Sequence, residues 1–375
     1  MPPSNGNEMV FLAGGDCGPV HGPDEGYPLE RYAEGVRPVF ASADLRFANC
    51  ERQYSANAAP GGRTSHGCQP PQMAGIFTEF GIDVLSLANN HMYDAGEQAL
   101  LDTRALMLRH RIAVSGAGKN LAEAREPAIV TRKGITVGFI SYCSALPKGS
   151  EAGPDKAGVA PLRVLTEYEH RGPHAGVRVI THPDPQDLRM LLDDITALRP
   201  RVDILIVSLH GGVIWVPRVV ADYQVMTAHA AIDAGADMIL GHHAHITKAI
   251  EVYKGKAIFH GLCHLCMTKP EPGAAWHEVP WKHGALRNHQ DLDPAYPLLP
   301  YGSHATRTLV AKAIFTKDGV KSVSFLPMII DAQYRPQSLK RDDPRFDEVT
   351  RYMEWASEGF AHTFTPQHNE VKVTE

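Results

Sequence analysis

Side chains that metals accept as ligands stand at or just after several short apolar runs of this sequence. The residues concerned are Asp16, Glu51, Asn90, His210, His243 and His245. Carboxylate, amide carbonyl and imidazole groups together suit manganese, zinc or iron, and in other proportions magnesium or calcium. The sequence therefore predicts a divalent-metal centre with one or two ions, and an enzyme is the expected use of such a centre.

Each of these positions also has an ordinary structural interpretation. Asp16 after two glycines suits a turn or a helix N-cap, Glu51 suits a surface carboxylate, and His210 suits a hydrogen-bonded core histidine. The segment Gly241-His242-His243-Ala244-His245 is harder to explain in that way. Alternate histidines after a buried strand lose their hydration, and a metal compensates for that cost.

The apolar runs before these residues have the continuity of strands that are buried on both faces. They are Val10–Ala13, Val84–Ala88, Ile135–Ser141, Ile204–Leu209, Met238–Leu240 and Ala257–Phe259. Helical spacing recurs between them, at Leu101, Ala105 and Leu108 and at Tyr223, Met226, Ala230 and Ala234, with Gly235 as a stop signal. Strands that alternate with helices predict a layered α/β fold, which binds ligands at the carboxyl ends of its strands.

The composition is that of an ordinary globular chain, with 375 residues of which 43% are hydrophobic and 21% charged. A formal net charge of −5 provides no general attraction to nucleic acid or to an anionic membrane. The N-terminus lacks the basic region of a signal peptide, and no segment has the roughly 18 apolar residues of a membrane span. We therefore expect a cytoplasmic protein that takes a small-molecule or peptide substrate, and a homo-oligomer is compatible with the sequence.

The length fits a single domain over residues 1–375 that carries one long insertion. Residues 268–305 are rich in proline, histidine and tryptophan, and we expect them to form an ordered lid near the site. The side chains predicted to bind substrate there are Trp276, Trp281, His283, Arg287 and Arg307. A packed surface loop or an oligomer contact is the alternative. Residues 144–184 are expected to be mainly loop, and the polar tail 364–375 to be flexible.

Several motifs in combination resemble the CapA-like proteins, which are named for capsule and poly-γ-glutamate biosynthesis and belong to the calcineurin-like metallophosphoesterase superfamily. The motifs are Gly15-Asp16, Asn49-Cys50-Glu51, Ala88-Asn89-Asn90-His91 with Asp94, Gly116-Ala117-Gly118, His210-x-Gly212 and the segment Gly241 to His245. The resemblance covers roughly residues 9–262, with a looser match over Thr308–Pro327. It implies the layered fold of that superfamily, in which helices flank β-sheets.

The resemblance also implies roles for individual residues. Glu51 would bridge two metals, of which one is also held by Asn90, His210 and His243 and the other by Asp16 and His245. His91 would be a general acid. Asp94 would hold its other ring nitrogen, which fixes the tautomer of the imidazole and raises its basicity.

The sequence departs from the pattern of these relatives in several places. Superfamily phosphatases have Asp-x-His where this chain has Asp16-Cys17-Gly18, so the second metal lacks one ligand and a single tightly held ion is compatible with the sequence. The Glu that often follows His-x-Gly is replaced within Val213–Val216. Ser-Leu-Gly-Asn-Phe is replaced by the segment His260 to His264, which leads us to expect both of these histidines at the rim of the site.

Three functions are compatible with these residues. The first is a metal-dependent hydrolase that cleaves an amide, peptide, lactam or ester bond of a carboxylated small molecule or γ-glutamyl-type substrate, with His91 as general acid. The second is a metal-dependent peptide epimerase that uses His91 with Asp94 on one face of a Cα atom and His264 or His260 on the other. The third is a non-catalytic assembly factor for polymer synthesis. We favour a hydrolase of a non-phosphate bond for two reasons. The resemblance is to a branch named for γ-glutamyl polymers, and no glycine-rich phosphate loop or arginine cluster stands beside the motifs.

Overall fold

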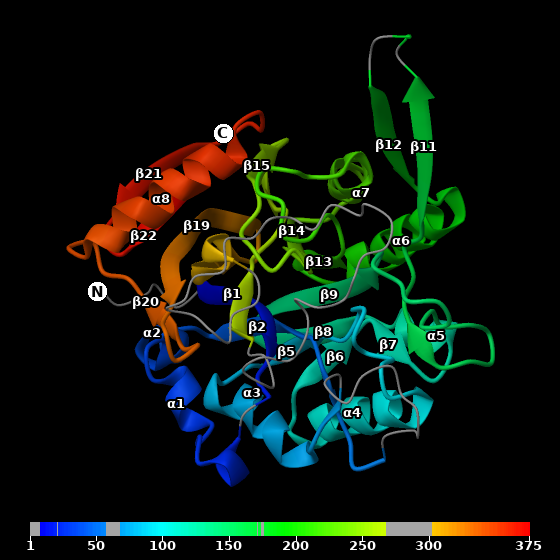
Figure 1. Ribbon diagram of the computed structural model, residues 1–375, viewed down its shortest axis with the longest axis horizontal. Helices are drawn as coiled ribbons and strands as arrows, with labels where there is room; N and C mark the ends of the chain where they lie inside the picture. Colours follow the sequence, from blue (N-terminus) through cyan, green and yellow to red (C-terminus); the bar gives the residue numbers. More distant parts are fainter. Residues whose placement is uncertain (1–7, 21, 58–67, 171, 174–175, 268–301) are drawn as a thin grey trace.

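The computed structural model describes residues 8–20, 22–57, 68–170, 172–173, 176–267 and 302–375. Within these residues, two large β-sheets pack against each other, and helices cover their outer faces (Figure 1). This arrangement confirms the predicted α/β class.

The larger sheet combines a parallel half with an antiparallel half. Its strand order is β21-β22-β19-β18-β1-β2-β5-β6, with β17 added to β1 and β20 added to β19. The strands are β1 (Met9–Gly18), β2 (Leu45–Cys50), β5 (Val84–Ser86), β6 (Ala113–Ser115), β17 (His264–Met267), β18 (Arg307–Thr316), β19 (Gly319–Ile330), β20 (Pro336–Ser338), β21 (Thr363–Gln367) and β22 (Glu370–Thr374). Strands β1, β2, β5 and β6 run parallel, so their carboxyl ends share one edge of the sheet.

The smaller sheet has four parallel strands at its centre and an antiparallel strand at each side. In spatial order the strands are β15 (Ile250–Tyr253), β16 (Lys256–Phe259), β14 (Met238–His242), β13 (Ile204–His210), β9 (Ile135–Cys143) and β8 (Ala128–Arg132). The central strands β9, β13 and β14 are buried almost throughout. The continuous apolar runs in the sequence are therefore strands covered on both faces, as predicted.

Aromatic side chains from both sheets fill the space between them. The ring of Phe47 in β2 stacks on that of Phe139 in β9, with centroids 5.5 Å apart, and the ring of Phe11 in β1 lies 6.0 Å from Phe139. All three side chains are fully buried. Burial of such a side chain contributes about 1.5–3 kcal/mol relative to exposure, so this layer fixes how the two sheets face each other.

Helices close the outer faces and one side of the pair of sheets. Four of them pack on the larger sheet: α1 (Glu30–Ala33), α2 (Arg37–Ala41), α3 (Gly75–Glu79) and α4 (Glu97–Arg109). The smaller sheet is covered by α6 (Pro185–Leu198) and α7 (Asp222–Asp233), and α5 (Leu121–Ala124) lies near its edge. Helix α8 (Pro344–Ser357) contacts β19 of one sheet and β15 of the other, and so covers the inter-sheet core at that side.

Short elements complete the described chain. The paired short strands are β3 (Gln53–Tyr54) with β4 (Cys68–Gln69), β7 (Ala117–Gly118) with β10 (Gly158–Val159), and β11 (Val164–His170) with β12 (Val177–Pro183). Single turns of 3₁₀-helix are η1 (Pro23–Glu25), η2 (Pro71–Ala74), η3 (Arg199–Arg201) and η4 (Ser303–Thr306).

Helix α4 lies where it was predicted but buries a different face. The expected stripe contained Leu101, Ala105 and Leu108, whereas the fully buried apolar side chains include Leu100 and Met107, and Leu108 is 46% exposed. Apolar residues occur around most of this helix, so their spacing indicates a helix without fixing which side faces the sheet. The predicted stop of the later helix α7 is confirmed, because Gly235 follows it with a φ of 116°.

Two stretches that were expected to be irregular form strands. Strands β11 and β12, within residues 144–184, make a hairpin that extends away from the rest of the molecule in Figure 1. The expectation of a flexible tail over 364–375 is also wrong, because β21 and β22 form a hairpin that joins the larger sheet at β19. Val371 and Val373 point into the inter-sheet core while their polar neighbours face outward, a period of two that polar composition conceals.

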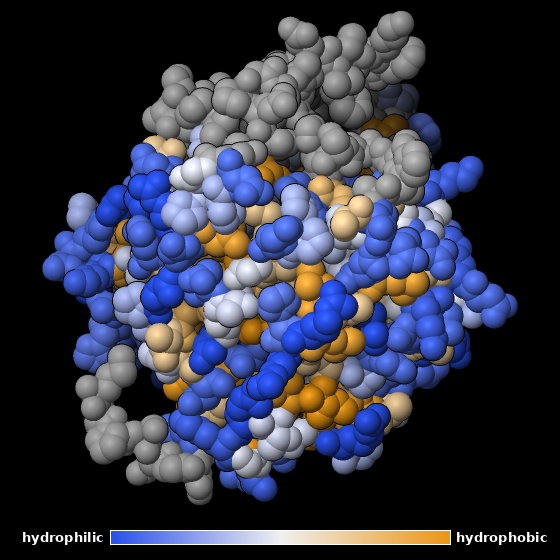
Figure 2. Space-filling model, turned by 90° about the horizontal axis from the view of Figure 1, so that it is seen from below, coloured by the Kyte–Doolittle hydropathy of each residue, from blue (hydrophilic) through white to orange (hydrophobic). Residues whose placement is uncertain are grey.

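Most of the expected lid, residues 268–301, lies outside the described residues. Its described end, residues 302–305, includes most of the 3₁₀ turn η4, and β18 begins just beyond it. Among the described helices, none has the length and apolar character that crossing a membrane requires. Figure 2 shows a face on which hydrophilic side chains alternate with small apolar areas, the usual condition of a globular surface.

The packing of the C-terminal hairpin can be tested by replacing Val371, which is fully buried, with alanine. We expect Val371→Ala to lower the free energy of unfolding by about 1–3 kcal/mol, because the lost methyl groups leave a gap between the sheets. Urea denaturation measures this change. The exposed neighbour Lys372 supplies the control, and Lys372→Ala should change the same quantity by less than about 0.5 kcal/mol. Equal effects of the two substitutions would show that the tail does not pack on the sheet.

Candidate metal centre

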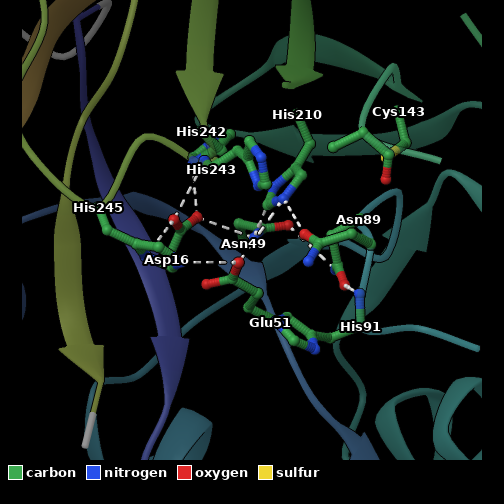
Figure 3. Close-up of polar contacts among 12 residues, drawn as sticks. Asp16, Asn49, Glu51, Asn89, His91, Cys143, His210, His242, His243 and His245 are labelled. Carbon is green, nitrogen blue, oxygen red and sulfur yellow. Dashed lines mark hydrogen bonds and ion pairs between the residues drawn. The ribbon is translucent and has the colours of Figure 1, made fainter. Parts of the chain in front are cut away.

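The candidate ligands meet where the carboxyl ends of parallel strands from both sheets come together (Figure 3). Asp16 lies near the end of β1, Glu51 directly follows β2, and His210 is the last residue of β13. His243 follows β14, and Asn90 lies in the turn after β5. The two sheets thus contribute opposite sides of one site.

The side chains form two groups of possible metal ligands that share Glu51. In one group the ligand atoms of Glu51, His210 and His243 all lie within 4.8 Å of one another, and in the other those of Asp16, Glu51 and His245 do. One Glu51 oxygen, Oε1, is 3.6 Å from Nε2 of His210 and 3.6 Å from Nε2 of His245. The Glu51 carboxylate thus lies between the imidazoles of His210 and His245, and its role as a bridging ligand stays a prediction.

Asn90 lies beside the group formed by Glu51, His210 and His243. Its Oδ1 lies 2.7 Å from Nε2 of His210, the same nitrogen that faces Glu51. The structure therefore brings all six sequence-predicted ligands together, although their binding of a metal stays a prediction.

The chemistry of the donor set fits a divalent cation. Both carboxyl oxygens of Glu51 and Nδ1 of His243 are buried without a hydrogen-bond partner among the described residues. A buried polar atom that lacks a partner costs about 1–3 kcal/mol, and more when it carries a charge. A cation between these atoms would remove that cost and accept their lone pairs.

Burial adjusts the protonation of the same groups. It lowers the pKa of His243 to about 4, and it lowers the pKa values of His210 and His245 well below their usual range. The imidazoles are therefore neutral near pH 7, which is the form that binds metals. Burial and the neighbouring Asp16 raise the pKa of the Glu51 carboxyl, and a dication beside it would favour the ionised form instead.

The carboxyl group of Asp16 behaves in the opposite way. Burial raises its pKa, but the ring of His242, whose Nδ1 lies 3.4 Å from Oδ1, and the neighbouring imidazoles of His210 and His245 outweigh that effect, so the net pKa is lowered. The Asp16 carboxylate is held on both oxygens, since Nδ2 of Asn49 donates to Oδ1 at 2.9 Å and the backbone N–H of His243 donates to Oδ2 at 3.1 Å. The Asp16 side chain is thus a fixed, ionised candidate ligand.

The backbone around the candidate ligand histidines has strained conformations, and neighbouring backbone segments approach each other closely there. His243 has a φ of 89°, His245 of 54° and Cys263 of 62°, all in the left-handed region that side chains disfavour. Such conformations cost on the order of 1–3 kcal/mol each and cluster at functional sites. Two glycines allow the close approach, because a Cβ on Gly15 would lie 2.2 Å from the Cys263 carbonyl oxygen, and one on Gly241 would lie 2.4 Å from that of His260.

Two asparagines for which no role was predicted hold the ligands in place. Nδ2 of Asn49 lies 2.9 Å from Asp16 and 3.3 Å from Nδ1 of His210, so one amide contacts ligands of both groups. Nδ2 of Asn89 donates to the Cys50 carbonyl at 2.7 Å, next to Glu51 in the chain. Both asparagines lie inside the motifs that resemble those of the CapA-like proteins. Their position in these motifs is the sequence signal from which a role at the site could have been predicted.

His91 and Asp94 form the pair that the sequence predicts. Nδ1 of His91 donates to Oδ2 of Asp94 at 2.6 Å, and the backbone N–H of His91 donates to Asn89 at 3.1 Å. The His91 side chain is 30% exposed, whereas the side chains of Glu51 and His210 are fully buried. Figure 3 shows His91 beside Glu51, so a partly exposed imidazole lies next to the buried candidate ligands.

The expectation that His260 and His264 lie at the rim is wrong, because both are buried. Nε2 of His260 bonds to Glu251 at 3.0 Å, and Glu251 also bonds to His229 at 2.7 Å. His264 is opposite Asp16 in the β1–β17 pairing and stacks on His245, with ring centroids 5.1 Å apart. His260 is therefore tied to a neighbouring carboxylate, and an acid–base role for His264 stays a prediction.

The predicted substrate-binding residues are mostly outside the described part of the chain. These are Trp276, Trp281, His283 and Arg287. Arg307 is described, at the start of β18, where its Nη2 is 2.5 Å from Glu348 and its guanidinium lies 5.3 Å from the Tyr352 ring centre. Its role in substrate binding stays a prediction.

Fold and site together define an α/β protein with a buried carboxylate–histidine centre that is suited to one or two divalent metals. Residues 10–268 match the family of the bacterial capsule synthesis protein PGA_cap, and the chain belongs to this family. The match includes every candidate metal ligand and the His91–Asp94 pair.

The names of two similar proteins agree with this family assignment. The chain is 27% identical over 230 residues to the PGA biosynthesis protein CapA of Bacillus subtilis, a match that covers 60% of this chain and 54% of that one. It is 36% identical over 187 residues to a Mycobacterium tuberculosis protein called probable polyglutamine synthesis accessory protein, covering 48% and 43% of the two chains. The chain thus spans about half the length of the curated relatives it matches.

Replacing the shared carboxylate should affect both groups at once, because both contain Glu51. We expect the wild-type protein, purified without chelator, to contain one or two equivalents of a transition metal, and Glu51→Gln to lose most of it. His243→Ala should lose the metal of its own group. Inductively coupled plasma mass spectrometry measures the content.

The matched control is a buried histidine outside both groups. His260→Asn should keep the wild-type metal content, because His260 is bonded to Glu251. Wild-type protein that contains no metal and binds neither added manganese nor zinc would contradict the assignment.

Proposed function

We propose that this protein is a metal-dependent hydrolase that cleaves an amide, peptide, lactam or ester bond of a carboxylated small molecule or γ-glutamyl-type substrate. The observation that carries the proposal is the position of the His91–Asp94 pair beside two ligand groups that share Glu51. A pure binding protein has no need of a carboxylate-held imidazole at that place.

The residues of the two groups would hold manganese, zinc or iron, and less favourably magnesium or calcium. A divalent metal supplies polarisation of a substrate oxygen and a more acidic water near pH 7. The two packed sheets with flanking helices support the layered metallophosphoesterase-type architecture that the sequence resemblance implies.

His91 would protonate the leaving group. Asp94 holds Nδ1, so the opposite ring nitrogen, Nε2, is the one that exchanges a proton with substrate. General acid catalysis of this kind is worth on the order of 100-fold to 10,000-fold in rate. Partial exposure lets His91 reach a leaving group, while the buried ligands below it stay shielded from water.

The choice of a γ-glutamyl-type bond draws on the sequence resemblance and on the relatives, whose names refer to PGA biosynthesis or to polyglutamine synthesis. The name of the mycobacterial relative also supports a second candidate, an accessory factor that assists polymer synthesis without catalysis. The peptide epimerase gains no support, because His260 is held by Glu251 and His264 packs behind His245. A cytoplasmic location belongs to the proposal as well.

Asp94→Asn should separate the hydrolase from the accessory factor. We expect the loss of the carboxylate to reduce kcat by about 10- to 100-fold and to shift the acidic or basic limb of the pH–rate profile, with metal content unchanged. The assay would screen γ-glutamyl amides, dipeptides and aryl esters with the manganese- or zinc-loaded protein.

The control for this substitution is Asp102→Asn, on the outer helix α4, where Asp102 accepts a hydrogen bond from Ser55. It should leave kcat within about twofold of wild type. A metal-loaded wild type that turns over no compound of the screen would favour the accessory factor, and an unchanged kcat in Asp94→Asn would remove His91–Asp94 from the mechanism.

A further inference from the structure

Lys248 is a buried cation that has no part in the mechanism described above. It follows the candidate ligand His245 by three residues, and its exposed fraction is 2%. Within the described residues no carboxylate forms an ion pair with it, and its Nζ donates instead to the backbone carbonyls of Val216 and Val219, the second at 3.0 Å. A buried ammonium group that is paired only with carbonyls is costly, which makes this lysine a candidate for a functional role.

The surrounding chain leaves room for the lysine side chain at one glycine. A Cβ on Gly261 would lie 2.7 Å from Cγ of Lys248 and 3.1 Å from its Cβ. The backbone N–H of Lys248 also donates to the Gly261 carbonyl at 3.0 Å, which fixes the start of the side chain. Burial lowers the pKa of Lys248 to about 7, as expected when an ammonium group is taken out of water. The structure thus places a costly amine at the carbonyls of a neighbouring loop.

The two carbonyls belong to residues 213–219, a loop that begins shortly after His210 at the end of β13. The loop has no carboxylate of its own that could pair with the lysine. Its backbone is strained, because Trp215 has a φ of 61° and Arg218 of 64°, both in the left-handed region that side chains disfavour. Such conformations persist only where neighbouring contacts hold them, and Lys248 supplies two of these contacts.

The 213–219 loop contacts the segment that carries two of the candidate ligands. The backbone N–H of Trp215 donates to the carbonyl of Ala244 at 3.0 Å, and Ala244 stands between His243 and His245. One of these histidines belongs to each ligand group. Both have left-handed backbone conformations, so the directions of their side chains depend on the contacts that hold this segment. A continuous set of contacts therefore runs from Lys248 through the loop to both groups.

We propose that Lys248 is a positioning residue of the metal centre, which holds the 213–219 loop in its strained conformation and through it fixes His243 and His245 for metal binding. The inference rests on the proposed function, because it concerns the same centre. A lysine with a purely structural role would stabilise the fold, whereas a lysine in this role weakens the fold and strengthens the site. The two roles therefore predict different effects of replacing it.

The experiment measures metal affinity and stability rather than turnover. Lys248→Met removes the amine at similar length, and we expect it to raise the dissociation constant for manganese by about tenfold or more, because the support of the ligand segment is lost. Lys248→Arg keeps donors for both carbonyls and should raise the constant by less. The melting temperature of metal-free Lys248→Met should equal or exceed that of metal-free wild type, because a buried charge is removed. Isothermal titration and scanning calorimetry of the full chain measure these quantities.

Hydrogen–deuterium exchange followed by mass spectrometry tests the route from the lysine to the ligands. We expect faster exchange over residues 211–219 and 242–246 in Lys248→Met than in wild type, because the loop and the ligand segment lose their anchor. The matched control is Lys256→Met on β16 of the same sheet, where Lys256 pairs with Asp237 at 2.7 Å. This control should leave the manganese constant and the exchange of both segments unchanged.

Arg218→Ala tests the loop from its other anchor. Nη2 of Arg218 lies 2.5 Å from Oε2 of Glu358, and the arginine side chain is 41% exposed, so its replacement should not prevent folding. The variant should raise the manganese constant in the same direction as Lys248→Met. It carries the test if Lys248→Met does not fold, and an unchanged constant would then overturn the inference.

A manganese constant in Lys248→Met equal to that of wild type would overturn the inference. So would weaker binding that comes with a lower melting temperature of the metal-free variant, because that pattern indicates a purely structural lysine. A wild type that binds no manganese would overturn the proposed function together with this inference, whereas an unchanged constant in Lys248→Met overturns the inference alone.

Discussion

The centre depends on the burial of one carboxyl group, that of Glu51, at the place where the two sheets meet. The group is fully buried, and neither of its oxygens has a hydrogen-bond partner among the described residues. A fold tolerates this only if other interactions hold the position in place. Here the pairing of β1 with β2, the inter-sheet aromatic core and the fixed Asp16 supply those interactions.

The main parts of this arrangement can be predicted from sequence because they depend on local patterns. Strands β9, β13 and β14 are continuous apolar runs that end in polar residues, so both the strand and the end that carries ligands are visible. Parallel strands bring such ends to one edge, which is why the sequence suffices to group Asp16, His210 and His243 at one site. The spacing of His91 and Asp94 likewise permits the contact seen between them.

Other parts depend on tertiary packing that one sequence does not reveal. The role of Asn49 comes from a contact with His210, which lies on a strand of the other sheet. His264 was placed at the rim because it follows a site strand, but its pairing with Asp16 turns it inward behind His245. The C-terminal hairpin was missed because its buried residues alternate with polar ones in a short, charged segment.

The glycine at position 18 changes the candidate ligand set more than it changes the backbone that carries the ligands. Left-handed residues such as His243 and His245, and glycines at strand ends, fix the backbone that carries the ligands whatever stands at position 18. Glycine at position 18 provides no side chain that could bind a metal, and a Cβ there would lie 2.7 Å from Cγ of Arg52, so the stem of that arginine packs against the strand at this point. The group of Asp16, Glu51 and His245 therefore has fewer possible protein ligands than the Asp-x-His pattern would supply, so the chemistry of the site depends on its own residues more than on the fold.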